Sequence, residues 1–276
     1  MPELPEVETA VRLLRPQLVG RTIGSARVFW PRTIGGQRAS DFERAVVGAR
    51  VAALRRRAKF IVADLERDGR GAGALLVHLR MTGRLYVESA RAPRDRFVKL
   101  ELALDRGRVL RFLDVRKFGR CLHVPDAAQA LAELGPEPLS AAFRAEWLAG
   151  ALRARRRRIK PLLLDQQFLA GMGNIYTDEC LHQSGIHPMA RSDRIDGERV
   201  KRLHQAIRAT LRAAIAREGS SFDTFYRTPE GKPGGYQDRF RVYGRAGEPC
   251  GNCGAPIRRV LVGQRGTHFC ARCQKR

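Results

Sequence analysis

The spacing of apolar residues changes character at one stretch of this chain, Leu134-Gly135-Pro136-Glu137-Pro138-Leu139. Before it, short apolar runs recur every ~8–12 residues between clusters of Gly, Asp and Arg, which is typical of antiparallel strands in a sandwich or barrel. After it, apolar residues recur at helical spacing. The stretch itself is a stiff breaker and the best domain boundary. The pattern predicts an α+β protein in which a β-sandwich domain precedes a helical domain.

The expected elements follow from these runs. Before the breaker, we expect strands at residues 23–30, 46–54, 60–65, 74–79, 97–104, 109–113 and 121–124. After it, we expect helices at residues 141–154, 159–169, 174–184 and 194–218. A helix should also open the chain, because one apolar stripe at helical spacing comprises Leu4, Val7, Val11, Leu14 and Leu18.

The chain begins Met1-Pro2-Glu3-Leu4-Pro5-Glu6, and this start can be interpreted in two ways. Proline and glutamate suit the first turn of a helix, so the segment could be an ordinary capped helix. Methionine before a small residue is normally trimmed, which would leave Pro2 with a free α-amino group. Such an amine titrates near ~7.7–8.0 and is partly uncharged near neutral pH. It could act as a nucleophile, with Glu3 and Glu6 moving protons beside it.

The charge of the chain points to an anionic partner. The 276 residues carry a net charge of +24 with a pI near 11.2, and 43% of them are hydrophobic. A globular, strongly basic protein is typical of nucleic-acid binders. A membrane-surface protein is the alternative, but the sequence contains no apolar run of about 18 residues and no signal peptide. We therefore expect a nucleic-acid partner and no membrane association.

Four of the six cysteines form two Cys-x-x-Cys pairs: Cys250, Cys253, Cys270 and Cys273. This spacing predicts one closed, structural Zn²⁺ site, whose metal supplies the folding energy that the short tail lacks. Basic residues between the pairs, among them Arg265, indicate a DNA-contacting hairpin, while a protein-binding zinc ribbon is the alternative. The isolated Cys121 and Cys180 lie in apolar segments and are expected in the core.

A turn with phosphate-binding character separates two expected helices. Gly171 and Gly173 allow close backbone approach, and Asn174 fits the N-cap of the next helix, whose free amides could bind a phosphate. Just upstream, residues 153–160 contain five arginines and Lys160. Such a run is often a solvated face. Beside this turn, it is better interpreted as an electrostatic track along a DNA backbone.

Three mixed clusters lie near expected strand ends of the first domain. They are centred on Lys59, on His78 with Met81, and on Arg116 with Phe118. From physical chemistry alone, Met81 and Phe118 would be core residues, and His78 a histidine with its hydrogen bonds satisfied.

Taken together, these motifs resemble the formamidopyrimidine-DNA glycosylases, bacterial enzymes that remove oxidised purines from DNA. The resemblance covers essentially the whole chain and includes Val242-Tyr243-Gly244-Arg245 besides the segments above. It implies a catalytic domain of a leading helix and β-sandwich (2–133), a helix–two-turn–helix domain (134–239) with a lid loop (220–237), and a zinc finger (240–276). Within the lid, Asp223 stands where several relatives carry a basic residue.

The resemblance also assigns roles to residues. Pro2 would be the nucleophile that forms a Schiff base, Glu3 would protonate the deoxyribose ring oxygen, and Glu6 would place the amine and water. Lys59, also counted with the catalytic group, would grip phosphates around the lesion. Further phosphate contacts would come from His78, Asn174, Tyr243 and Arg265. The space left by a flipped nucleotide would be filled by Met81, Arg116 and Phe118, with Arg116 facing the orphaned cytosine.

The implied activity is glycosylase and lyase action on damaged double-stranded DNA in base excision repair, with β- and δ-elimination. We expect one zinc ion, no nucleotide cofactor, a monomer and a cytoplasmic location. Two alternatives stand beside this interpretation. An endonuclease VIII-type enzyme for oxidised pyrimidines would share the Pro2-Glu3 start, and a non-catalytic zinc-finger protein could keep the DNA contacts alone.

Overall fold

The computed structural model describes residues 1–222 and 226–276. Asp223, noted above in the lid, lies outside the described residues. Within the described part, every helix is too short or too polar to cross a membrane.

The chain falls into two compact units. Residues 1–133 and 217–235 form the first, and residues 134–216 and 236–276 form the second. The division after Glu133 coincides with the start of the sequence breaker. Two boundaries differ from the expectation: most of the lid belongs to the first unit, and the cysteine-rich tail is part of the second. The reason for the first difference is a set of polar contacts to Glu6, described below.

Helix α1 (Leu4–Leu18) opens the first unit, as the apolar stripe predicts. Glu3 is its N-cap residue, and Glu3 and Glu6 form a capping box in which each side chain accepts a hydrogen bond from the other's backbone. Pro5 lies in the first turn, where its missing N–H costs no hydrogen bond. The whole predicted stripe is buried, and it packs against strands of the first unit.

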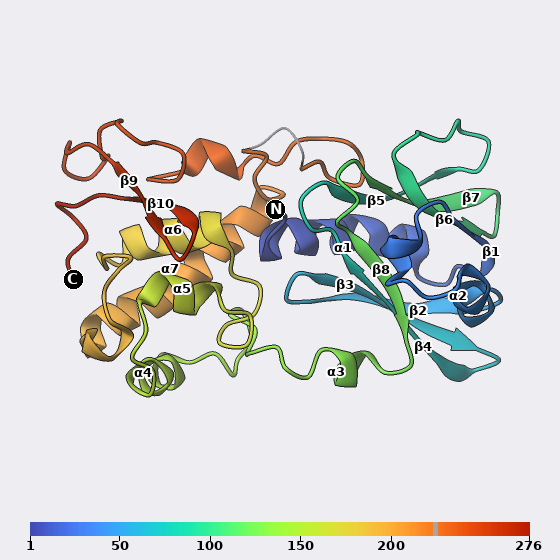
Figure 1. Ribbon diagram of the computed structural model, residues 1–276, viewed down its shortest axis with the longest axis horizontal. Coiled ribbons are helices and arrows are strands. Elements are labelled where there is room, and N and C mark those ends of the chain that lie inside the picture. The colour runs from blue at the N-terminus through green and yellow to red at the C-terminus, as the bar shows by residue number, and fades with distance from the viewer. Residues whose placement is uncertain (223–225) are drawn as a thin grey trace. The chain divides into compact units, whose positions relative to one another are not determined.

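Two four-stranded antiparallel sheets complete this unit (Figure 1). In order across the first sheet, the strands are β1 (Ile23–Val28), β6 (Val98–Leu104), β7 (Arg108–Asp114) and β5 (Gly83–Ser89). In the second sheet they are β2 (Arg50–Arg57), β3 (Phe60–Arg67), β4 (Arg70–His78) and β8 (Arg120–Val124). The predicted β-sandwich is therefore present.

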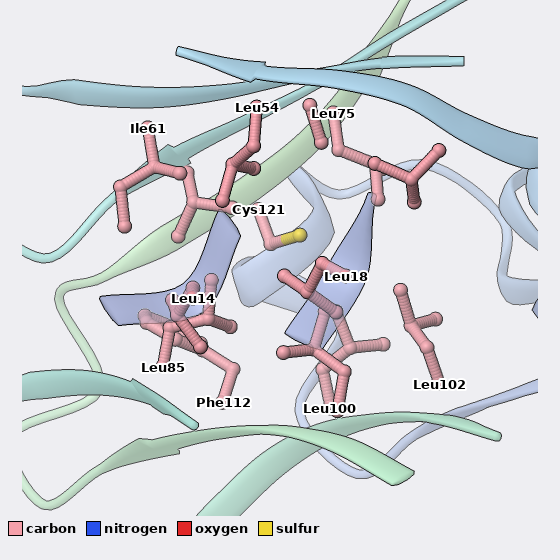
Figure 2. Packing of buried hydrophobic residues seen from close by; sticks show 14 of the residues in the cluster. Leu14, Leu18, Leu54, Ile61, Leu75, Leu85, Leu100, Leu102, Phe112 and Cys121 are labelled. Carbon is pink, nitrogen blue, oxygen red and sulfur yellow. The ribbon is translucent and has the colours of Figure 1, made fainter. Parts of the chain in front are cut away.

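The sandwich core is filled by aliphatic and aromatic side chains from both sheets and from α1. Figure 2 shows Leu54, Ile61 and Leu75 of one sheet directed toward Leu100 and Phe112 of the other. Leu14 and Leu18 of α1 enter the same core. Cys121 lies within it as a free thiol, and burial raises its pKa to about 12, so it is the inert core residue that was expected.

Several local elements differ from the sequence expectation. Residues 46–54 do not form one strand: helix α2 (Ala39–Val46) ends there and β2 begins after a turn. Strand β5 was missed, because its alternation of polar and apolar residues is too short to stand out. Short elements lie at η1 (Pro31–Ile34) and α3 (Ala127–Ala130).

The second unit is helical, as predicted, with a C-terminal hairpin. Its helices are α4 (Ala145–Arg153), α5 (Ile159–Leu164), α6 (Asn174–Gln183) and α7 (Gly197–Ala216). All four are shorter than the expected ranges. The short 3₁₀ helix η2 (Ser192–Arg194) precedes α7, and η3 (Tyr236–Arg239) follows it. The hairpin pairs β9 (Arg258–Val262) with β10 (Arg265–Phe269). Helix α6 packs against both α7 and β10. The thiol of Cys180 in α6 is buried and lies 3.6 Å from the carbonyl oxygen of Ala206.

Candidate functional site

The residues that follow Met1 are buried and held by carboxylate contacts. Pro2 is buried, whereas Met1 is exposed. Removal of Met1 would therefore leave a free α-amino group on Pro2 at this buried position. The backbone N–H of Glu3 donates to Oε2 of Glu6 at 2.8 Å. Oε1 of Glu6 accepts from the backbone N–H of Ser220 at 2.8 Å and from its hydroxyl at 3.3 Å. Glu6 therefore fixes the residue that follows Pro2 and links it to a segment distant in sequence.

That distant segment approaches Glu6 closely. Gly219 has φ +81°, and a Cβ there would lie 2.7 Å from Oε1 of Glu6. The Tyr226 hydroxyl lies 3.3 Å from the carbonyl oxygen of Glu6 and 3.2 Å from that of Glu218, to which it donates. Burial, and next the Glu6 charge, raise the pKa of Tyr226 well above its usual value, so it remains a donor. Sequence reasoning missed these contacts; a glycine just after a long helix was the available signal.

Lys59 and His78 are brought together by strand pairing. Lys59 lies in the two-residue loop between β2 and β3, where Ala58 adopts the left-handed region with φ 52°. The next residue, Phe60, is paired with His78, and the two rings contact edge-to-face at 4.8 Å. Both Lys59 and His78 are buried. The turn geometry thus presents a lysine beside a histidine.

The protonation state of His78 follows from its surroundings. Burial, with the nearby charges of Arg80 and Lys59, lowers its pKa to about 3. Its Nδ1 accepts from the backbone N–H of Arg80 at 3.0 Å, which leaves the proton on Nε2. His78 is therefore a neutral hydrogen-bond donor at neutral pH, suited to a phosphate oxygen.

Met81, Arg116 and Phe118 form one exposed cluster. A terminal nitrogen of Arg116 lies 3.2 Å from the Met81 sulfur, and its guanidinium carbon lies 5.1 Å from the centre of the Phe118 ring. Phe118 is 49% exposed, so the interpretation as a core residue was wrong for it. The structure brings together the three residues that the resemblance groups, with an aromatic ring facing solvent.

Two buried polar residues hold this cluster in place. Asp114 accepts hydrogen bonds from the backbone N–H of Gly119 at 2.7 Å, from that of Arg116 at 3.3 Å, and from the Thr82 hydroxyl. The Arg116 N–H also donates to the Thr82 hydroxyl oxygen at 3.1 Å. Sequence reasoning missed Thr82 and Asp114 as positioning residues, because their partners come from two different loops.

In the second unit, Asn174 is not the N-cap of α6, as was expected; Gly173 takes that position and Asn174 is the first helical residue. Its side-chain N–H group instead donates to the carbonyl oxygen of Gly266 at 3.0 Å and lies 3.4 Å from the Tyr243 hydroxyl. Arg265, which precedes Gly266, is exposed at the start of β10. The three expected phosphate contacts of this unit are therefore neighbours.

Lys160 is the one expected DNA contact that the structure contradicts. Its side chain is fully buried, and its ammonium donates to Oδ1 of Asp178 at 2.6 Å and to the carbonyl oxygen of Gly266 at 3.1 Å. A buried, paired ammonium cannot reach a DNA phosphate, so Lys160 joins α5, α6 and β10 instead. In the adjacent run, Arg156 and Arg157 are both exposed, and Arg157 pairs with Asp165 at 2.8 Å.

Glu179 of α6 holds the backbone that carries Tyr243. Its carboxylate accepts from the N–H groups of Arg241 at 2.8 Å, Val242 at 2.9 Å and Tyr243 at 2.9 Å. Burial raises its pKa, although the three N–H donors act in the opposite direction. Nothing in the local sequence indicated this role, because the partners lie about 60 positions away.

The four cysteines of the tail converge. Their sulfur atoms all lie within 4.8 Å of one another, and two of the separations are 3.9 Å (Cys250 to Cys273) and 3.5 Å (Cys253 to Cys270). A tetrahedron with Zn–S bonds of about 2.3 Å places its sulfurs about 3.8 Å apart. The cluster therefore fits one tetrahedral zinc ion, and the β9–β10 hairpin lies between its two pairs of ligands.

Comparisons with known proteins agree with this geometry. The model of the formamidopyrimidine-DNA glycosylase N-terminal domain matches residues 1–121, that of the H2TH domain residues 134–226, and that of a zinc finger found in FPG and IleRS residues 247–276. The formamidopyrimidine-DNA glycosylase of Geobacillus kaustophilus is 44% identical over 100% of both chains. That of Chloroflexus aurantiacus is 46% identical over 99% of this chain and 98% of its own.

Solved structures match over the same length. A Lactococcus lactis FPG variant in complex with Fapy-dG-containing DNA superimposes with a TM-score of 0.90 at 35% identity, covering 100% of both chains. The Thermus thermophilus MutM (FPG) protein gives 0.87 at 39% identity, covering 99% of this chain and 98% of its own. The expected fold, with its helix–two-turn–helix domain and Cys₄ zinc finger, is confirmed. The chain therefore belongs to the formamidopyrimidine-DNA glycosylase family.

Proposed function

We propose that the protein is a bifunctional DNA glycosylase and AP lyase of base excision repair that removes oxidised purines from double-stranded DNA. The observation that carries this proposal is the buried Pro2 two residues before α1, with Glu3 and Glu6 fixed beside it by mutual hydrogen bonds. The relatives support the substrate class: Lactococcus lactis Fpg has been crystallised with DNA containing Fapy-dG and with DNA containing an abasic site.

The chemistry begins at the sugar C1′. After Met1 is trimmed, the uncharged Pro2 amine attacks C1′, and the damaged base leaves with the bonding electrons. The nitrogen loses its N–H proton and the departing base takes up one proton, so the step balances. Glu3 protonates the ring oxygen, which opens the sugar to an iminium ion. Because the proline nitrogen is secondary, this iminium has no N–H proton to lose and stays an electron sink.

Strand cleavage follows because the iminium ion withdraws electrons from the opened sugar. The iminium makes the 2′-proton acidic, and its removal expels the 3′-phosphate by β-elimination. A second elimination expels the 5′-phosphate, so a one-nucleotide gap remains. Glu6, held by Ser220, keeps the Glu3 backbone in place next to the reacting amine through both steps.

The reaction requires the damaged nucleotide to leave the base stack, which costs a few kcal/mol. The exposed Phe118 ring and the adjoining Met81 and Arg116 side chains would fill the vacated space and offset that cost. Lys59, the neutral donor His78 and, in the second unit, Asn174, Tyr243 and Arg265 would hold the phosphates. Arg116 would read the opposing base.

The zinc ion has a structural role in this proposal. Cys250, Cys253, Cys270 and Cys273 would hold it with no coordination position left for water, so it supplies folding energy to the tail and takes no part in the chemistry. The proposal also includes action as a monomer in the bacterial cytoplasm without a nucleotide cofactor, since an asymmetric lesion requires no two-fold symmetry.

Borohydride trapping tests the assignment of the amine. The protein should become covalently linked to DNA that contains 8-oxoguanine opposite cytosine, because borohydride reduces the iminium to a stable amine. Pro2→Gly keeps an α-amine and should trap weakly, and a form that retains Met1 should not trap. Equal trapping by all three proteins would show that another amine reacts.

Opposite-base discrimination tests the role of Arg116. A base-edge contact contributes about 1–3 kcal/mol of discrimination. Arg116→Ala should therefore narrow the rate difference between cytosine and adenine opposite 8-oxoguanine. Lys117→Ala, which removes a neighbouring charge, is the matched control and should leave that difference unchanged. If Arg116→Ala slows all opposing bases equally, the residue positions DNA without reading it.

A further inference from the structure

Helix α6 carries a polar stripe that faces the interior. Asn174, Asp178 and His182 recur every four residues and so lie on one face of the helix. Asp178 and His182 are buried and Asn174 is half-buried. Burying a polar side chain costs free energy unless it forms a hydrogen bond, so each residue of the stripe is expected to have a partner.

Each residue of the stripe contacts the C-terminal tail. Asn174 donates to the carbonyl oxygen of Gly266 at 3.0 Å, and Asp178 accepts from the backbone N–H of His268 at 2.8 Å. The third, His182, brings Nε2 to 3.4 Å from the sulfur of Cys250. Two residues thus hold strand β10, and the last reaches a zinc ligand.

The tautomer of His182 follows from its two nitrogens. Within the described part of the chain, Nδ1 is buried and has no hydrogen-bond partner. If Nδ1 carried the proton, a buried N–H would be unsatisfied and the lone pair of Nε2 would face a thiolate. If Nε2 carries it, that N–H points at the sulfur and only an acceptor is left without a partner. The second arrangement is the more stable one.

We propose that His182 is an outer-shell donor of the zinc site: its Nε2–H hydrogen-bonds the Cys250 thiolate and helps to retain the metal. Four thiolates around one Zn²⁺ leave an excess of negative charge in a partly buried site. An N–H donor reduces the charge on one sulfur and fixes its orientation. Because α6 also holds Gly266 and His268, metal retention and docking of the hairpin depend on the same helix. His182 is buried and acts through Cys250, so it is a positioning residue.

Zinc release from the full-length holoprotein to a chromogenic chelator tests the proposal. His182→Phe keeps an aromatic ring but removes the donor, and it should weaken zinc retention by about 10–100-fold. His182→Gln keeps an N–H donor and should be intermediate. The control is His204→Phe, the same change at a histidine whose Nε2 contacts the carbonyl oxygen of Phe143 instead. Release at the wild-type rate from His182→Phe would overturn the proposal.

Two further readouts separate a hydrogen bond from simple packing. In the cobalt-substituted protein, loss of the N–H···S bond should move the sulfur-to-metal charge-transfer band of His182→Phe to longer wavelength, and His182→Gln should restore it. The thermal destabilisation of His182→Phe should shrink when zinc is stripped from both proteins. An unshifted band, or equal destabilisation with and without zinc, would mean that the ring only fills space. Should His182→Phe not fold, His182→Met, which also lacks the donor, replaces it.

Discussion

Glu6 illustrates at the scale of one residue what the sequence reveals and what it leaves out. Its place in the first turn of α1 and its capping box with Glu3 are readable from local sequence, and so is its proximity to Pro2. Its bond to Ser220 spans 214 positions and could not be predicted, because no local pattern specifies which loop returns to a helix start. The same limit applies to Asp114, whose partners lie on separate loops.

A substitution at Gly219 tests whether the segment that contacts Glu6 also positions the start of the chain, where Pro2 and Glu3 lie. Gly219 and Gly36 share φ +81°, but they differ in their surroundings. An added Cβ at Gly219 would lie 2.7 Å from Glu6 Oε1, whereas at Gly36 no atom of the described residues other than its chain neighbours lies within 4 Å. Alanine at either position should lower the free energy of unfolding by about 1–3 kcal/mol through backbone strain. Urea denaturation measures that loss. Only Gly219→Ala should also slow borohydride trapping; similar trapping rates for the two variants would contradict the role given to Glu6.

His78 predicts a pH dependence of stability. Its pKa is lowered to about 3, mainly by burial, while an unfolded histidine titrates near 6.5. The unfolded chain therefore binds this proton first, so the stability is complete above about pH 6.5 and declines as the pH falls toward 3. At pH 5 the loss should be about 2 kcal/mol. Denaturation of the wild type and of His78→Asn at neutral pH and at about pH 5 measures this loss of stability. An identical decline in the variant would exclude His78 as the cause.

Helix α6 shows, for a whole element, what the local sequence predicts and what it does not. Its existence and bounds were predicted almost to the residue, with residues 174–184 expected and Asn174–Gln183 observed. The use of its polar residues was not predicted, because Asp178, Glu179 and His182 each contact a residue of the C-terminal region between 62 and 90 positions away. A helix buried on several sides lacks an apolar stripe that would indicate which face packs against which neighbour.

The corrected role of Lys160 can be tested against its exposed neighbour in the arginine run. Lys160→Ala leaves the buried Asp178 carboxylate without its ammonium and should cost about 3–5 kcal/mol of stability. It should not change the slope of DNA affinity against salt. Arg156→Ala should do the reverse, with little effect on stability and a salt slope lower by about 1. Calorimetry and binding titrations at several salt concentrations distinguish them, and a reduced slope for Lys160→Ala would restore it as a phosphate contact.

Over the whole molecule, the breaker at Leu134 and the change from strand-like to helical spacing predicted both the sandwich and the division after Glu133. The errors are of a different kind. The expected strand at 46–54 merged the end of α2 with the start of β2, since both contribute apolar residues across a short turn. The expected lid was counted with the helical domain, whereas residues 217–235 pack in the first unit, because chain order does not determine which unit a segment packs in.

That packing predicts how a fragment should behave. A chain of residues 1–133 contains α1 and both sheets but lacks Ser220 and Tyr226, so Glu6 would lose the partners that those residues supply. We expect this fragment to be less stable than the same unit in the full chain, and a synthetic peptide of residues 217–235 to bind it and raise its Tm. The same peptide with Ser220→Ala should bind more weakly. No stabilisation by either peptide would show that the segment is dispensable for the first unit.

The chain passes from one unit to the other three times, after residues 133, 216 and 235. This connectivity restricts how such a gene can be recombined. A single crossover at the first boundary would join Glu6 from one parent to Ser220 and Tyr226 from the other, although the three residues form one set of contacts. Hybrids between relatives should therefore remain functional only when the segment 217–235 comes from the same parent as the N-terminal 133 residues. Such a hybrid requires two further crossovers, after residues 216 and 235. The contacts of one carboxylate thus set the smallest block of sequence that can be exchanged intact.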